Sequence, residues 1–179
     1  KNPMFSSNDQ LLVSGNALAR FGTANGENTT HVDLNLGTKK FASLASITFS
    51  DFEDFRMGNN RSHGYEDFGK ILNYVTTING QDSMVANPDD NIHQRTAFNQ
   101  LNLLQKFSYQ RNENLKFGLN IQYSKSSQIN RFDKLNEYRN GKLRFSEWYY
   151  GPQNRLLTAF TLESKKETKL FDYFTINSA

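Results

Sequence analysis

Strict alternation of apolar and polar residues over residues 115–124 is the feature that most constrains the fold of this chain. The odd positions hold apolar or aromatic residues and the even positions small, amide or charged ones: Leu115, Phe117, Leu119, Ile121 and Tyr123 against Lys116, Gly118, Asn120, Gln122 and Ser124. A period of two residues indicates a β-strand with one apolar and one polar face. About ten residues is also the length that a tilted strand needs to cross a lipid bilayer.

The same pattern recurs and predicts about seven long strands. Further alternating segments lie at residues 11–21, 31–36, 41–50, 101–109, 156–162 and 174–176. Tight polar turns at residues 37–40, 111–114 and 164–168 alternate with a second class of connection at residues 22–28, 51–95 and 126–153. Outer-membrane barrels have short turns at one rim and longer loops at the other. We therefore expect an all-β, antiparallel up-and-down meander that forms an open segment of a large transmembrane β-barrel.

The composition supports a barrel wall better than a soluble core. Only 36% of the 179 residues are apolar and the mean hydropathy is -0.72, yet 13% are aromatic. A disordered chain lacks such aromatics, whereas a barrel wall needs apolar and aromatic side chains on its lipid face and polar ones toward its lumen.

One segment of the long connection at residues 51–95 has a pattern of its own. Asn79-Gly80, flanked by residues 74–78 and 81–85, predicts a β-hairpin with a type I′ turn that projects above the barrel.

Several classes of function are disfavoured by what the chain lacks. It has no cysteine, and therefore no disulfide framework, thiolate metal site or cysteine nucleophile. Its net charge is +3 without a dense basic run, so we expect no nucleic-acid partner. No apolar stretch reaches the roughly 20 residues of a membrane-spanning helix. The chain opens at Lys1 without a signal peptide or an initiator methionine, which predicts either a removed leader or an internal fragment.

Four segments of the chain carry a resemblance to a known family: residues 74–87, 99–107, 130–135 and 147–153. They resemble TonB-dependent outer-membrane receptors, in particular the subgroup of haem or iron-complex receptors. The resemblance implies that residues 1–179 are a partial barrel, without the plug domain, the TonB-interacting box and the remaining strands of a barrel of about 22 strands. It also implies a Gram-negative outer membrane, contact with membrane lipid, import of an iron complex, haem or similarly scarce nutrient, and TonB as a partner through the missing plug. No resident cofactor is expected.

The candidate ligand-binding residues lie in the long connection at residues 51–95. Arg61 and Tyr65 could hold an anionic, partly aromatic ligand by charge and stacking, and His63 and His93 could ligate iron as neutral imidazoles. The alternative is an ordinary solvated loop, because no metal-site spacing surrounds them. The carboxylate pairs Glu53/Asp54 and Glu137/Glu147 have no predicted shared cleft. We therefore expect neither a metal site nor an enzyme.

Two other functions fit the same pattern. One is a small complete outer-membrane barrel that acts as an adhesin or structural protein, with an eighth strand near either end. The other is a soluble all-β binding module. A piece of a large barrel is expected to have its first and last long strands unpaired with each other, whereas a closed small barrel would join them.

Overall fold

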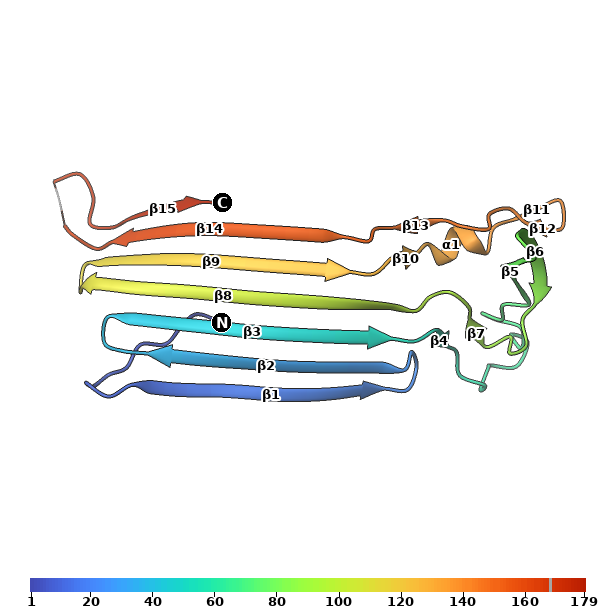
Figure 1. Cartoon of the computed structure of the whole chain (residues 1–179), viewed down its shortest axis with the longest axis horizontal. Helices are drawn as coiled ribbons and strands as arrows, with labels where there is room; N and C mark the ends of the chain where they lie inside the picture. The colour runs from blue at the N-terminus through green and yellow to red at the C-terminus, as the bar shows by residue number, and fades with distance from the viewer. Residues whose placement is uncertain (168) are drawn as a thin grey trace.

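In the computed structural model the chain forms one large antiparallel sheet of seven strands, in the order β1-β2-β3-β8-β9-β14-β15 (Figure 1). The structure describes residues 1–167 and 169–179. The seven strands are β1 (Leu12–Gly22), β2 (Glu27–Gly37), β3 (Phe41–Phe52), β8 (Phe98–Asn112), β9 (Leu115–Ser126), β14 (Asn154–Ser164) and β15 (Phe174–Ser178). Each long strand pairs with the next long strand along the chain, so the predicted all-β antiparallel meander is confirmed.

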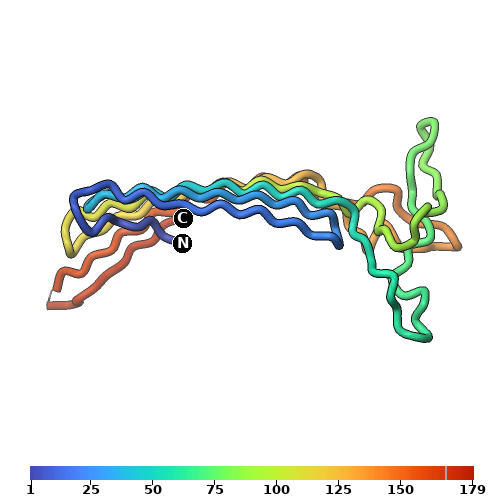
Figure 2. Tube along the Cα trace, turned by 90° about the horizontal axis from the view of Figure 1, so that it is seen from below, coloured from blue at the N-terminus to red at the C-terminus, as the bar shows by residue number. Residues whose placement is uncertain are grey.

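The sheet is open in the part of the chain that the structure describes. Its edge strands are β1 and β15, and no ladder joins them. The expectation that the first and last long strands are unpaired with each other is therefore confirmed. Figure 2 shows the sheet arched across its strands, with the N-terminal residues under the arch.

The remaining elements are short and lie in the connections. They are β4 (Phe55–Arg56), β5 (Asn73–Ile78), β6 (Gln81–Ala86), β7 (Ile92–His93), β10 (Ile129–Asn130), α1 (Phe132–Leu135), β11 (Tyr138–Arg139), β12 (Lys142–Leu143) and β13 (Tyr149–Tyr150). They form four two-stranded ladders, β4–β7, β5–β6, β10–β13 and β11–β12. Within the described residues, no helix has both the length and the apolar character to span a membrane.

The connections segregate by end of the sheet, as the sequence predicts. Residues 23–26, 53–97 and 127–153 join strands at one end, and residues 38–40 and 113–114 join them at the other (Figure 1). The third connection at the turn end is longer than expected. It runs from residue 165 to residue 173, because β15 begins only at Phe174; of the predicted turn at residues 164–168, Thr168 lies outside the described residues.

Two hairpins with Asn-Gly turns stand in the long connections. In the first, β5 and β6 pair from Asn73 to Ala86, and Asn79 and Gly80 have φ of 52° and 78°. Positive φ at both central residues is what a type I′ turn requires, so this predicted hairpin is confirmed, and Figure 2 shows it (green) standing away from the sheet. The second joins β11 and β12 through Asn140-Gly141, with φ of 52° and 76°. This second hairpin was not predicted, although its Asn-Gly signal is the same.

The cross-strand register divides the sheet into two chemically different faces. Residues directly opposite each other in an antiparallel ladder share a face. One row therefore runs Ala17, Val32, Ile47, Leu103, Tyr123 and Leu156, and an adjacent row on the other face runs Leu18, His31, Thr48, Asn102, Ser124 and Arg155. We call these the apolar face and the polar face. Leu119 and Ile121 belong to the apolar face, and Asn120 and Gln122 to the polar face.

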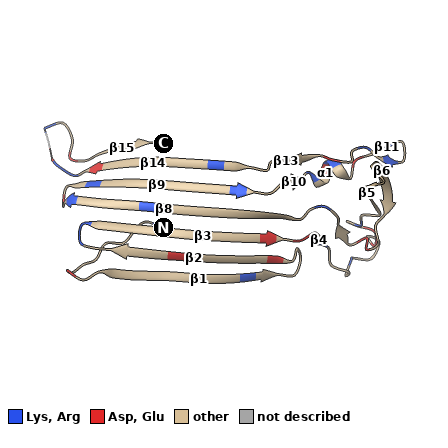
Figure 3. Ribbon diagram, viewed as in Figure 1, with Lys and Arg blue, Asp and Glu red and all other residues tan. Residues whose placement is uncertain are grey.

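Charged residues of the long strands follow this division. Seven lie on the polar face: Arg20, Glu27, Asp33, Lys106, Lys116, Arg155 and Glu163. The other three, Asp51, Arg111 and Lys125, lie near strand ends. Figure 3 shows few charged residues along the long strands and many in the turns and loops. The centre of the apolar face is therefore free of charge in the seven described strands.

Burial in this sheet is the reverse of that in a soluble protein. Asn35 on the polar face is 0% exposed, whereas its neighbour Leu34 on the apolar face is 45% exposed. The buried hydrophobic residues of the described chain are only Ala42, Leu44 and Leu135. The exposed apolar side chains include Val32, Leu34, Leu36, Phe41, Ile47, Phe49, Leu103, Tyr109, Leu156 and Phe160, all on one face. An apolar surface this large and contiguous marks a site of contact with another protein or with a membrane.

Candidate functional site: a platform of two loops

The two longest connections join into one structure beyond the loop end of the sheet. We call residues 53–97 and 127–153 together the loop platform. Arg95 is its main link, since its Nη1 donates to the carbonyl oxygen of Ser146 and its own carbonyl accepts from Asn130 Nδ2 at 2.9 Å. Arg95 has φ of 69°, a conformation that is unfavourable for a residue with a side chain. The contacts between the loops thus hold a strained backbone in place.

His93 is the second link between the two loops. Its ring stacks on Phe132 of α1, with centroids 4.5 Å apart and an interplanar angle of 2°. Its Nε2 lies 3.0 Å from the carbonyl oxygen of Gly69, and because a carbonyl can only accept, Nε2 carries the proton. The Nε2 atom is therefore occupied by this hydrogen bond, and the ring supports the packing of the loops.

The other predicted ligand-binding residues lie elsewhere in the platform. Arg61 and Tyr65 line one surface depression of about 460 Å³, together with Met57, Phe68 and neighbouring polar residues. Arg61 donates from Nε to the Phe68 carbonyl at 2.8 Å and from Nη2 to Asn91 Oδ1 at 2.6 Å, which fixes its guanidinium at the rim. His63 is fully exposed and lies 3.3 Å from Glu66. The structure thus brings together Arg61 and Tyr65, but neither His63 nor His93 lines this depression.

A second depression, of about 350 Å³, lies between the β5–β6 hairpin and the other loop. It is lined by Val75, Thr77, Asp82, Arg95, Ser146 and Glu147, among others. The hydrogen bond with Ser146, followed by the one with Thr77, lowers the pKa of Asp82. Sequence reasoning missed this depression because its two walls are about 60 residues apart and no local pattern links them. Its charged groups and backbone carbonyls suit a polar ligand or a hydrogen-bonding protein surface.

Carboxylates in the platform are held by specific partners. Arg56 lies 2.6 Å from Asp89 and lowers the pKa of that carboxyl, and Lys134 followed by Arg144 lowers the pKa of Glu137. Asp54 Oδ1 accepts from the amides of Thr96 and Ala97 at 2.6 and 2.9 Å. A lowered pKa means that the ionised form supports the folded loops, so this support is present above the ordinary carboxyl range near pH ~4 and is lost as the pH falls through the lowered pKa.

These contacts give two of the four carboxylates considered in the sequence, Asp54 and Glu137, structural roles. Asp54 and Glu137 are used in binding backbone amides or neighbouring cations, and Glu147 lines the second depression. Among the described residues, no group of three or more histidine, cysteine, aspartate or glutamate side chains could hold a metal ion.

We expect Arg95→Ala to loosen the loop platform. Alanine keeps the same unfavourable backbone conformation, so the change isolates the guanidinium. Hydrogen bonds made by charged groups contribute about 1.5–3 kcal/mol, and hydrogen exchange of residues 131–148 should accelerate accordingly. Arg139→Ala is the matched control, because Arg139 is exposed in the β11–β12 hairpin. This change should leave the exchange unchanged. Equal exchange in the two variants would contradict the role given to Arg95.

Comparison of the chain with protein-family models, with curated proteins and with solved structures found no match. The class that the geometry itself defines is an open antiparallel sheet with an exposed apolar face, a polar face that the N-terminal residues cover at one end, and a loop platform at the other end.

Proposed function

We propose that this chain is a barrel-wall and extracellular-loop portion of a TonB-dependent outer-membrane receptor that imports an iron complex, haem or a similarly scarce nutrient. The observation that carries the proposal is the reversed burial of the sheet, in which Val32, Leu34 and Ile47 are exposed while Asn35 is covered. In water this exposure would be unfavourable by about 25 cal/mol per Å² of apolar area. In a bilayer it is favourable, and a polar face toward a lumen completes the arrangement.

The loop platform has the features of a ligand-binding rim in this proposal. It lies wholly at one end of the sheet, as the extracellular loops of a barrel do. Arg61 and Tyr65 share one depression, and a fixed guanidinium beside an exposed aromatic ring suits an anionic ligand with a flat group. His63 and His93 remain predicted contributors, although the hydrogen bond of His93 Nε2 leaves only Nδ1 for a ligand. TonB would act through a plug domain outside this chain.

The two alternative functions, a soluble binding module and a small complete barrel, each require a feature that can be checked in the sheet. A soluble binding module needs its apolar face covered, and nothing in the described structure covers Val32, Ile47 or Leu103. A small complete barrel needs a ladder between β1 and β15, which the described residues do not form. The exposed apolar face therefore favours a wall segment of a larger barrel.

Membrane fractionation tests the proposal. The protein should stay with the outer membrane after washing with high salt and with alkaline carbonate, because the apolar face is held by lipid and not by surface charge. Once extracted, it should remain in solution only with detergent. A small soluble protein expressed in the same cells controls for trapping in vesicles. Recovery of the protein in the soluble fraction, and monodisperse behaviour without detergent, would support the soluble binding module.

A further inference from the structure

An N-terminal segment, residues 1–6, crosses the polar face at the turn end of the sheet. Asn35 lies beneath it with 0% exposure. The Oδ1 atom of Asn35 accepts from the Met4 amide at 2.8 Å, and its Nδ2 donates to the Met4 carbonyl at 3.1 Å. One side-chain amide therefore satisfies both backbone groups of Met4, as a neighbouring strand would in a ladder.

The other contacts of the segment are also mostly to its backbone. Lys106 Nζ donates to the carbonyl of Lys1 at 2.9 Å and lies 3.3 Å from Asn2 Oδ1. The Ser6 amide donates to the Thr38 carbonyl at 3.0 Å. Besides Asn2 Oδ1, the side chain of Lys1 also contributes, because its Nζ pairs with Asp33 at 2.7 Å.

Gly37 permits the close approach of the segment. A Cβ at this position would lie 2.2 Å from the Met4 carbonyl oxygen, well inside van der Waals contact. Gly37 is not among the glycines with positive φ, so the backbone itself does not demand glycine. The absence of a side chain matters here for the space that the segment occupies.

We propose that this end of the polar face is a recognition surface for an extended polypeptide, with residues 1–6 as the segment seated on it. Asn35 and Gly37 recognise backbone, so the surface selects an extended conformation more than a sequence. Asp33 adds one preference for sequence. It favours a cationic side chain, here Lys1, three residues before the residue whose backbone Asn35 binds, here Met4. The inference does not rest on the proposed membrane location, because it uses only contacts within the polar face.

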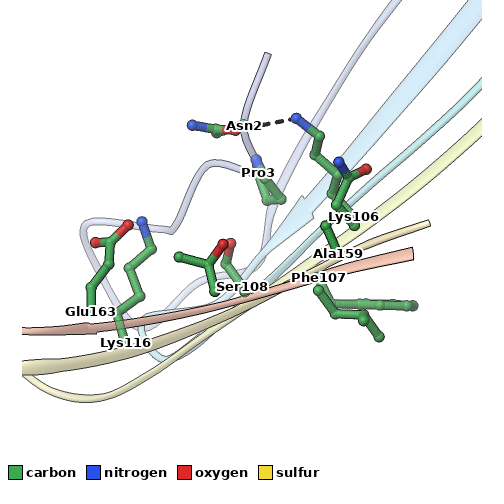
Figure 4. A pocket seen from close by; sticks show the side chains of 12 residues that line it. Asn2, Pro3, Lys106, Phe107, Ser108, Lys116, Ala159 and Glu163 are labelled. Atoms are coloured by element: carbon green, nitrogen blue, oxygen red, sulfur yellow. Dashed lines mark hydrogen bonds between the residues drawn. The ribbon is translucent and has the colours of Figure 1, made fainter. Parts of the chain in front are cut away.

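The seated segment also forms one wall of a cavity that is open to solvent. In Figure 4, Asn2 and Pro3 lie over a space of about 200 Å³ whose other walls include Lys106, Lys116 and Glu163. Lys116 Nζ lies 6.0 Å from the centroid of the Phe5 ring. Departure of the segment would remove this wall, take away the contacts of Lys106 with Lys1 and Asn2, and leave Asp33 with Asn16 and His31 as its partners.

Hydrogen exchange on the full chain in detergent tests the proposal, with Gly37→Ala and Gly118→Ala as a matched pair. Both glycines lie in the same cross-strand row of the polar face, but a Cβ at Gly118 meets its nearest atom at 3.6 Å, an ordinary contact. In Gly37→Ala the protection of the Met4 and Ser6 amides should fall about tenfold or more, as expected when several hydrogen bonds are lost. In Gly118→Ala it should persist, with β2 and β3 amides unchanged in both.

Asn35→Leu and Asn102→Leu form a second pair, since Asn102 is an amide on the same face whose Oδ1 accepts from Ser124 and Gln100. Only Asn35→Leu should release Met4. Should a sheet variant fail to fold, Met4→Pro removes the recognised N–H from the segment alone, and the Ser6 amide should then lose protection. Protection of Met4 that survives Gly37→Ala, or exchange in the unmodified chain as fast as in a free peptide, would overturn the proposal.

Discussion

Ile47→Arg should destabilise the protein in lipid by about 2–4 kcal/mol, the range measured for a cation on the lipid face near the bilayer midplane. Ile47 is 48% exposed and lies between Val32 and Leu103 on neighbouring strands. In water, a half-exposed position of this kind tolerates arginine within about 0.5 kcal/mol. The size of the effect, measured by unfolding from lipid vesicles, therefore reports the medium that the apolar face contacts.

Ser46→Arg is the matched control, one residue away and on the opposite face. Ser46 lies directly across from Asp33, so a cation there faces a carboxylate and a polar surface. Its effect should be small. Similar losses of stability for the two variants would contradict the assignment of faces, and a negligible effect of Ile47→Arg would favour a soluble protein.

Whole-cell labelling should place the two Asn-Gly hairpins on the outside and the short turns on the inside. The chain has no native cysteine, so single cysteines at Asn79, Asn140, Asn112 and Glu167 can each be probed alone. Asn79 and Asn140 lie in the loop platform, and Asn112 and Glu167 at the turn end. An impermeant thiol reagent should label the first pair nearly completely and the second pair only after the cells are opened.

Labelling of all four cysteines after lysis is the control that each thiol is accessible in the folded protein. Labelling of position 112 but not of position 79 on intact cells would invert the proposed orientation. Labelling of none of them before lysis would contradict the location in the outer membrane.

The strands and their two faces were predictable because both depend on neighbours in the sequence. Successive side chains of a strand point to opposite faces, so the alternation in residues 115–124 already separates Leu119 from Asn120. The register then follows from the short connections, because residues 38–40 and 113–114 leave little freedom in how β2 meets β3 or β8 meets β9. The hairpin at Asn79-Gly80 was predictable for the same local reason, and the one at Asn140-Gly141 was equally accessible.

The candidate site was only partly predictable. Arg61 and Tyr65 are four residues apart, and proximity in the sequence brought them into one depression. His93 was proposed as a ligand from its residue type, and that role stays a prediction. The sequence did not indicate that its ring stacks on Phe132 or that its Nε2 bonds the Gly69 carbonyl. The role of a histidine depends on what packs against it, and Phe132 comes from a different loop.

Local periodicity and turn geometry were sufficient to predict the class of fold and the chemistry of each face. The folded structure was needed to show that Arg95 joins Ser146, that the two long loops form one platform, and that Asn35 binds Met4. Each of these contacts links residues at least 31 positions apart. Such pairs leave no periodic trace in the sequence, since their partners meet only after the sheet has set the distance between them.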